Sequence, residues 1–476
     1  MYKTTHQGRG VRRESTAPSL DVLLHSFEEC FTRPGFVLFR ALVCGWVLCR
    51  ARKWISAVIV FARWFAPRHH SSFYRFFTAA RWSPDALGRK LFELLLPRFP
   101  DVIDAMVDDT LCRRAGPRIF GISMQRDGSA SGYGGSVSTV FACGHSWVVL
   151  SVRLPLPWNS RGCAVPVLAR LYRSPKRCSK SRYRKRTELA REMLELLASW
   201  LPDGRTLHLS GDREYACRTL LRGLSTAIEF TGPMPMDASL FGPVPRYKGI
   251  GRPRLRGEEL PNPRQTADAR HRPWFSIDVQ LYGGRSSKLL IKTWTCLWYT
   301  ATGQRLVRIV VTRDPRGVLE DRAFFSTATA EDAATILKRF AGRWLLEVAF
   351  RDAKQMLGLG DPQNGFSRGV RRRKKTAGPQ PRGERGRRAV ERTVPFIWTI
   401  YGIVVVWYTS QSRWQRDVDH ARRRRPWYTH KEHPSLEDML EALRVEIYVH
   451  RLSGKALQFR THAETRRALR SVGLAA

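Results

Sequence analysis

Apolar residues recur every three or four positions from Leu20 to about Pro97, a spacing that predicts a helical N-terminal region. Within it, Ser83 followed by Pro84 predicts a helix start, with serine as the N-cap and proline at the first helical position. The stretch 67–82 mixes aromatic and basic side chains, which fits either an inward-packed helix or a small DNA-binding helical domain.

The pattern changes at Val102, where apolar and β-branched residues predict strands at 102–110, 138–154 and 163–172. A Gly-rich segment at 126–136 predicts a hairpin loop, and it lacks the Lys-Ser/Thr ending of a phosphate-binding loop. A helix from Thr187 to Trp200, with Thr187 as its N-cap, a strand at 206–212 and a further helix follow. This order predicts a mixed α/β fold.

The composition changes between 226 and 325. Pro, Gly and Arg are frequent there and strand-like runs follow, so we expect a β-rich insertion. A helical pattern resumes at Ala330 and continues to Gly358. Beyond it we expect a basic linker, an apolar helix and a helical C-terminal region.

The charge balance is strongly basic, with 82 Lys and Arg against 41 Asp and Glu, a net charge of +41 and a pI near 11.0. Such an excess predicts a polyanionic partner, either nucleic acid or an acidic membrane. Basic residues concentrate in four runs, at 180–186, 371–375, 382–388 and 422–425, which we expect to contact phosphate backbone.

Two features bear on location. The nine cysteines stand singly without a CxxC pair, which argues against a structural zinc site and for a reducing, cytoplasmic protein. The segment 393–412 carries no charge and is about as long as a membrane span. We expect a buried core helix there, with a membrane-associated protein as the alternative.

Two aspartates close predicted strands: Asp109 in VIDAMVDDT and Asp212 in TLHLSGD. Carboxylates at strand ends of an α/β sheet lie where sites form. Each alone is equally typical of a turn or helix cap, and Asp108 is a neighbouring candidate for the first position.

A third carboxylate, Glu347, stands in RWLLEVAFRDAKQMLG at 343–358. At about 100° per residue on a helix, Glu347, Phe340, Arg343, Arg351 and Lys354 all fall within roughly 40° of one meridian. Salt bridges at this spacing contribute only about 0.3–0.5 kcal/mol each. We therefore expect the cations to face phosphates and Glu347 to face metal.

Asp109, Asp212 and Glu347 together fit phosphodiester chemistry with two divalent ions about 4 Å apart. Mg²⁺ prefers such hard oxygen ligands. We expect these three residues to be catalytic metal ligands, and Arg343 and Lys354, with a weaker addition from Arg351, to hold DNA phosphates.

At these residues the chain resembles bacterial insertion-sequence DDE transposases of the branch with a Tyr-Arg-Glu-Lys signature helix. Arg343, Glu347 and Lys354 match that signature in residue and spacing, and Phe340 replaces its tyrosine without the hydroxyl. VDDT resembles the first-aspartate motif and SGDREY the second. The resemblance covers roughly residues 30–360.

The resemblance implies an RNase H-like catalytic domain, two Mg²⁺ or Mn²⁺ ions, and cut-and-paste movement of double-stranded DNA between element ends and target. It also implies a homodimer assembled on DNA, and an insertion aromatic, here Trp294 or Trp298, that holds a flipped base. Cross-strand packing is the alternative for either tryptophan. A catalytically inactive DNA-binding protein is the alternative function, and we expect nucleoid association without a membrane.

The expected domains run in chain order: an unstructured lead at 1–18, a helical DNA-binding domain at 19–100, the RNase H-like domain at 101–360 with its insertion at 226–325, a basic linker at 361–390, and a helical region at 391–476.

Overall fold

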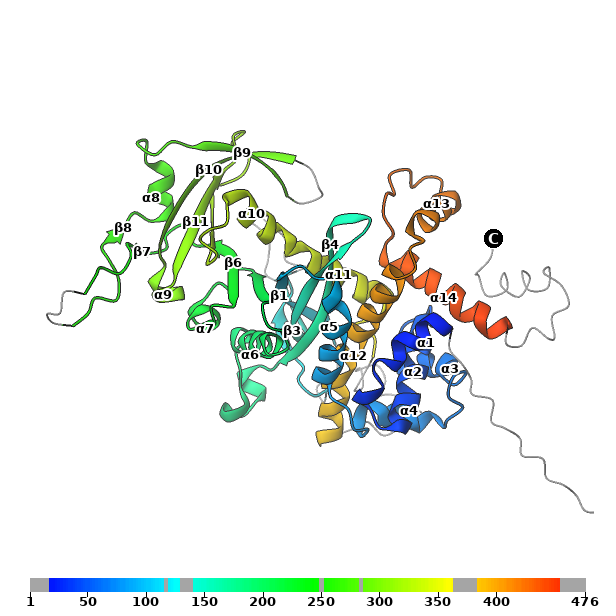
Figure 1. Cartoon of the computed structure of the whole chain (residues 1–476). Helices are drawn as coiled ribbons and strands as arrows, with labels where there is room; N and C mark the ends of the chain where they lie inside the picture. The colour runs from blue at the N-terminus through cyan, green and yellow to red at the C-terminus, as the bar shows by residue number, and fades with distance from the viewer. Residues whose placement is uncertain are drawn as a thin grey trace, which may run out of the picture. The chain divides into compact units, whose positions relative to one another are not determined.

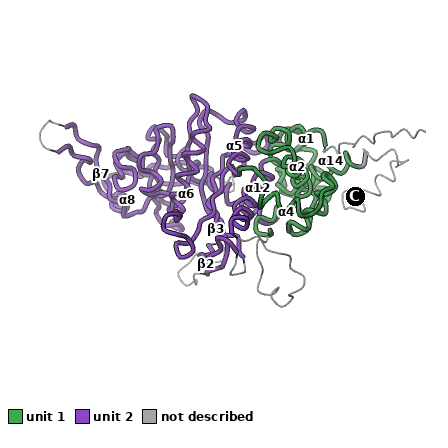
Figure 2. Tube along the Cα trace, turned by 90° about the horizontal axis from the view of Figure 1, so that it is seen from below, with its two compact units in different colours: residues 1–83, 356–362, 403–476 green, residues 84–355, 363–402 purple. Residues whose placement is uncertain are grey.

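The computed structural model describes residues 17–114, 119–128, 140–247, 252–281, 286–362 and 383–453. Almost all of the expected lead, most of the Gly-rich segment, the basic run 371–375 and most of the basic linker lie outside these residues. The chain divides into two compact units, one formed by 1–83, 356–362 and 403–476, the other by 84–355 and 363–402 (Figure 2).

The first unit is helical, which confirms the pattern predicted from Leu20 onward. Gly45 of α2 lets this helix approach α3 closely, because a Cβ atom there would lie 2.8 Å from the Cβ of Ala62. From the C-terminal part of the unit, Arg444 donates a 2.7 Å hydrogen bond to the carbonyl of Val47. Its helices are α1 (Pro18–His25), η1 (Glu28–Cys30), α2 (Arg33–Leu48), α3 (Ile55–Ala62), α4 (His70–Thr78), α13 (Trp414–Arg424) and α14 (Leu436–Ser453).

The second unit is built on one mixed sheet of twelve described strands (Figure 1). The main path of the sheet runs β2-β3-β1-β5-β6-β12-β11-β10-β7-β8, with β4 paired to β3 and β9 to β10. The strands are β1 (Val102–Arg113), β2 (Ser123–Arg126), β3 (Phe141–Leu156), β4 (Asn159–Tyr172), β5 (Thr206–Gly211), β6 (Ile228–Met234), β7 (Leu240–Phe241), β8 (Glu259–Leu260), β9 (Phe275–Gln280), β10 (Ser286–Leu297), β11 (Leu306–Arg313) and β12 (Arg322–Ser326).

β1 has different partners on its two sides. It pairs in parallel with β5 up to Val107 opposite Gly211, and antiparallel with β3 as far as Arg113 opposite Gly144. The expectation that β1 ends at Asp109 is therefore wrong, because the ladder to β3 continues after β5 has stopped. Asp108 and Asp109 lie at the point where the parallel pairing ends.

The segment 226–325 is β-rich as predicted, and its strands extend the same sheet. β6 pairs in parallel with β5, and β12 returns antiparallel against β6. Two short helices, α8 (Pro263–Asp268) and α9 (Tyr299–Thr302), interrupt the strands. This segment is thus hydrogen-bonded, strand by strand, to β5 and through β5 to β1, the strand that carries Asp108 and Asp109.

Helices pack on both faces of this sheet. α5 (Pro84–Leu95) begins at Pro84 as predicted, and it contacts β4 at Gly88, where a Cβ atom would lie 2.1 Å from the carbonyl oxygen of Val167. α6 (Arg186–Ala198) contacts β3 and β4, whereas α10 (Ala333–Gly342) contacts β5, β6, β9 and β12.

Two helix predictions need correction. Thr187 is not the N-cap of α6; Lys185 is, and its backbone N–H donates a 2.7 Å hydrogen bond to the Glu188 carboxylate. The helix expected after Asp212 is only the short α7 (Arg218–Leu221), because a turn at Asp212 comes first.

The apolar segment forms part of α12 (Gly383–Thr409). By length and composition alone this helix could cross a membrane, and 83% of its most apolar window is buried inside the protein. That burial is typical of a core helix, the structure expected for this segment.

Candidate active site

Three aspartates lie together at the point where β1 and β5 diverge. Because Val107 pairs with Gly211 in parallel register, Asp108 and Asp212 follow at equivalent positions of neighbouring strands. Asp109 is the next residue along β1, so its side chain points to the opposite face of the sheet from that of Asp108. The sequence prediction had placed Asp109 and Asp212 together without distinguishing these faces.

The helical segment that carries Glu347 is broken at Arg343. α10 ends at Gly342, and α11 (Trp344–Met356) begins one residue after the break, with Glu347 in its first turn. Arg343 nevertheless keeps helical dihedral angles, φ −53° and ψ −32°, and pairs with Glu347 four residues further on, so these two side chains lie on one face. Phe340 belongs to α10, and its ring packs against Phe324 at a centroid distance of 4.8 Å within a hydrophobic cluster.

Arg343 joins two carboxylates from different elements. One of its guanidinium nitrogens donates to Asp108 on β1, and another lies 2.8 Å from the Glu347 carboxylate on α11. The Arg343 side chain is 16% exposed. This shared cation draws the start of α11 to the strand and places Glu347 on the Asp108 face of the sheet.

Asp109 has a separate set of partners on the other face. The Ser146 hydroxyl donates to its carboxylate at 3.3 Å, and the Arg186 guanidinium lies 3.5 Å away. Arg186 also donates to Gln125 at 2.7 Å and stacks over the Tyr172 ring at 4.3 Å. The sequence prediction included Arg186 only as the end of a basic run, because its contacts come from three distant strands.

Burial and like charge both act on this cluster. Burial, offset by Arg343 and reinforced by Asp212 and Asp109, raises the pKa of Asp108 to about 7. Burial likewise raises the pKa of Asp109, with Arg186 and Lys354 acting in the opposite direction. A raised carboxyl pKa beside another carboxylate means that the site would bind a further cation favourably.

The donor set suits a hard divalent cation, since it consists of carboxylate oxygens from β1, the end of β5 and α11. Within the described residues, however, no three Asp, Glu, His or Cys side chains approach closely enough to enclose a metal. In this conformation Arg343 pairs with Asp108 and Arg186 with Asp109, on opposite faces of β1.

Tyr215 adds an unusual feature beside the carboxylates. Its side chain is fully buried, and its hydroxyl has no hydrogen-bond partner within the described part of the chain. Burial, followed by the charges of Asp109 and Asp108, raises its pKa well above the ordinary value. Tyr215 is therefore a protonated phenol whose O–H donates no hydrogen bond to a described residue.

The two other predicted phosphate ligands, Lys354 and Arg351, differ in the charged groups around them. Lys354 is exposed on α11 and close enough to lower the pKa of Asp109. Arg351, by contrast, pairs with its neighbour Asp352 at 2.9 Å. Asp352 is buried and lies off the stripe, as the helical spacing predicted.

The two candidate tryptophans lie in different surroundings. Trp294 on β10 is half-buried, opposite Ile309 of β11, with the Arg272 guanidinium 5.8 Å from its ring. Trp298 is 7% exposed and packs edge-on against Phe325 at 5.0 Å. Only Trp294 presents ring surface outside the core.

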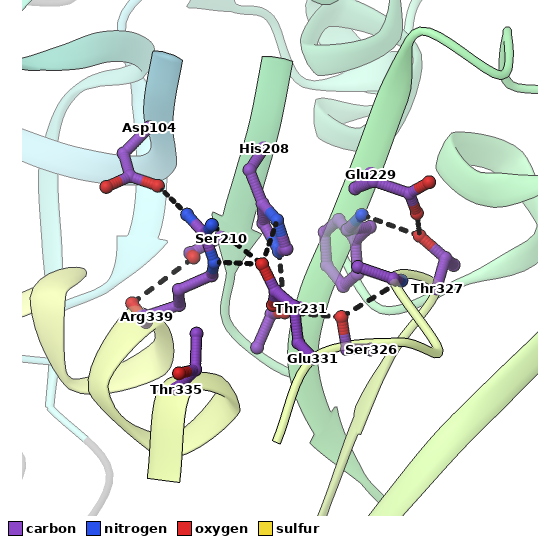
Figure 3. Close-up of polar contacts among 12 residues, drawn as sticks. Asp104, His208, Ser210, Glu229, Thr231, Ser326, Thr327, Glu331, Thr335 and Arg339 are labelled. Carbon is purple, nitrogen blue, oxygen red and sulfur yellow. Dashed lines mark hydrogen bonds and ion pairs between the residues drawn. The ribbon is translucent and has the colours of Figure 1, made fainter. Parts of the chain in front are cut away.

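A buried polar network ties α10 to the strands (Figure 3). Arg339 donates to Asp104 of β1 and pairs with Glu331 at 2.7 Å, while its backbone carbonyl accepts from Ser210 of β5. His208 lies 3.7 Å from Glu331 and 2.7 Å from the Thr231 hydroxyl.

Burial, with Arg339 nearby, lowers the pKa of His208 to about 3, so its imidazole is neutral. Neutral and charged hydrogen bonds from three strands thus fix α10 one turn before the break that carries Arg343 (Figure 3). The network supports the position of the Glu347 helix.

Comparison with known proteins agrees with this geometry. No curated protein matches the chain. A family model described as DDE superfamily endonuclease matches residues 26–281, more than half of the chain. The match includes all three aspartates and stops before Glu347. With its large mixed sheet and carboxylates at the strand ends, the chain belongs to the DDE superfamily endonucleases.

Proposed function

We propose that the protein is a DNA transposase that cuts at the ends of an insertion sequence and joins the freed ends to target DNA. The observation that carries the proposal is the arrangement of aspartates from β1 and β5 beside Glu347 of α11, with Arg343 between them. The endonuclease family and the net charge of +41 both favour DNA as substrate.

In this proposal Asp212, Glu347 and an aspartate of β1 hold two Mg²⁺ or Mn²⁺ ions. When bound, the ions supply activation of the attacking oxygen and charge stabilisation of the leaving oxygen. Arg343 partly compensates the charges of Asp108 and Glu347, and its fork of donors is suited to a phosphate at the same place.

We propose Asp108, rather than Asp109, as the β1 ligand. Asp108 shares a sheet face and the Arg343 guanidinium with Glu347, whereas Asp109 is engaged by Ser146 and Arg186. Asp109, the stronger candidate from the sequence motif, becomes the competing assignment.

We further propose an RNase H-like arrangement for the catalytic unit and a homodimer on paired DNA ends, as the resemblance to insertion-sequence transposases implies. Trp294 is the better candidate for stacking on an unpaired base, because its ring is less buried than that of Trp298. Lys354 is the better phosphate ligand than Arg351, whose charge Asp352 already balances.

The test is cleavage of DNA carrying the ends of the element, in the presence of Mg²⁺. Glu347→Gln keeps the size of the side chain and removes its charge, so we expect cutting to fall by about 10²- to 10³-fold, a typical loss for a residue that stabilises developing charge. Binding of the ends should change little.

Asp352→Asn is the matched control, because Asp352 lies on the same helix but faces away from the site. It should cut at close to the wild-type rate. Normal cutting by Glu347→Gln would overturn the site assignment. A wild-type protein that binds the ends but never cuts them would instead support an inactive DNA-binding protein.

A further inference from the structure

A hollow of about 430 Å³ lies between α13 and α14 in the first unit. Its lining is strongly basic, and the arginines on it are Arg50, Arg413, Arg416, Arg423, Arg424 and Arg425. His420 and four carboxylates complete its charged lining. None of these residues belongs to the candidate active site.

Each carboxylate of the hollow already has a cationic partner. Glu441 pairs with Arg50 at 2.7 Å, and Asp417 pairs with Arg413 at 3.3 Å. The remaining two are also occupied, Glu437 by Arg425 at 2.9 Å and Asp438 by Lys431 at 2.6 Å. The negative charge of the hollow is therefore neutralised within the protein.

Three arginines remain after this pairing. Arg416, Arg423 and Arg424 are exposed, and their side chains make no hydrogen bond or ion pair with any described residue. On a helix, Arg416, His420 and Arg423 fall within about 60° of one another, with Arg424 at the margin. Val418, on the other side of α13, is buried, so the cationic stripe faces outward along the hollow.

Compensation of the helix dipole does not explain this stripe. Cations near the C-terminus of a helix are favourable, which would account for Arg423 and Arg424 in the last turn of α13. Arg416 lies in the first turn, where the dipole opposes a positive charge. A row that includes it is better explained by an external anion.

We infer that this hollow binds the phosphate backbone of duplex DNA. From Arg416 to Arg424 the helix rises about 12 Å, which spans about three phosphates of one strand. Arginine forks suit phosphate oxygens, and such contacts position DNA without reading its sequence. The choice of DNA among polyanions rests on the proposed function, while the site itself rests on the unpaired arginines.

The experiment measures binding of a labelled random-sequence duplex to the full chain by fluorescence anisotropy, without metal, as salt is varied. The triple variant R416A/R423A/R424A should show a slope of log affinity against log salt that is shallower by about 2.7. Between about 50 and 200 mM salt, the wild type should lose about 40-fold more affinity than the variant.

The matched control is R416K/R423K/R424K, which keeps the three charges and should keep the wild-type slope. The unfolding temperature of both variants should equal that of the wild type, because the three side chains have no partners to lose. A wild-type slope in the alanine variant would overturn the proposal.

The proposal would also be overturned if the alanine variant lost binding to vesicles of anionic phospholipid while its salt slope for duplex binding stayed at the wild-type value. Cleavage at low salt with Mg²⁺ separates this proposal from the proposed function. The alanine variant should still cut there, because the site around Glu347 is intact. A wild type that shows the predicted salt slope but never cuts would support DNA binding by the hollow and contradict the proposed transposase function.

Discussion

The Asp108 carboxyl is largely buried, and a single arginine offsets part of its negative charge. Its side chain is 13% exposed, and its only described cationic partner is Arg343, which also serves Glu347. Sharing one guanidinium leaves each carboxylate incompletely compensated, which suits a site that must accept cations from solution. Substituting Asp108 and Asp109 one at a time therefore tests which of the two is the metal ligand.

We expect Asp108→Asn to lose cleavage as completely as Glu347→Gln does, because both replace a charged carboxylate by a neutral amide on the same face. Asp109→Asn should retain measurable cleavage, since Ser146 and Arg186 can still hold the asparagine oxygen. Single-turnover cleavage with Mg²⁺ on end-bearing DNA measures both. The reverse ranking would restore Asp109 as the metal ligand.

The raised pKa of Asp108 also predicts a dependence of stability on pH. A carboxyl whose pKa rises from 3.8 to about 7 on folding destabilises the folded state increasingly from about pH 4 to pH 7 and fully above that. Asp108→Asn removes this penalty. Without metal, the variant should gain on the order of 1–4 kcal/mol in free energy of unfolding at pH 8.

The same variant should differ little from the wild type below pH 4, where Asp108 is neutral in both states. Urea unfolding at several pH values measures the difference. An equal gain at all pH values would show that packing, and not charge burial, sets the effect.

At the level of helices and strands, the contact between α5 and β4 depends on one glycine. A methyl group at Gly88 would overlap the carbonyl oxygen of Val167, which is backbone and cannot rotate away. We expect Gly88→Ala to lower the free energy of unfolding by about 1–3 kcal/mol. Chemical denaturation of the full chain measures the change.

Gly342→Ala is the control of opposite sign. Gly342 ends α10, and a Cβ atom there would meet nothing within 4 Å. The gain in helix propensity should raise stability by about 0.5–1 kcal/mol. Tolerance of Gly88→Ala would contradict the close packing described for α5, and destabilisation by Gly342→Ala would contradict the open space around Gly342.

Element types followed well from the sequence, because periodicity reports which face of a segment is buried. The strand and helix order around Asp109, Asp212 and Glu347 was predictable in that way. The end of α10 at Gly342 and the new start of α11 at Trp344 were not, since the sequence of 340–354 has the periodicity of one helix. Arg186 was missed because strand register, not local sequence, brings it to Asp109.

At the scale of the whole chain, the long apolar helix is the feature most open to another interpretation. α12 has the length and composition of a membrane span, yet its apolar window is mostly buried. We expect the protein to be released from membranes by a carbonate wash and recovered in the supernatant. Retention in the washed pellet would favour the membrane-associated alternative.

The continuous sheet of the second unit fixes the spacing between the strands that carry the candidate site residues. From β1 to β10 the path crosses five strand pairings, through β5, β6, β12 and β11. At about 4.8 Å for each pairing, the strand that carries Trp294 stands about 24 Å from the one that carries Asp108. Hydrogen bonds fix that interval, so a base stacked on Trp294 would be held at a set distance from the carboxylates of β1.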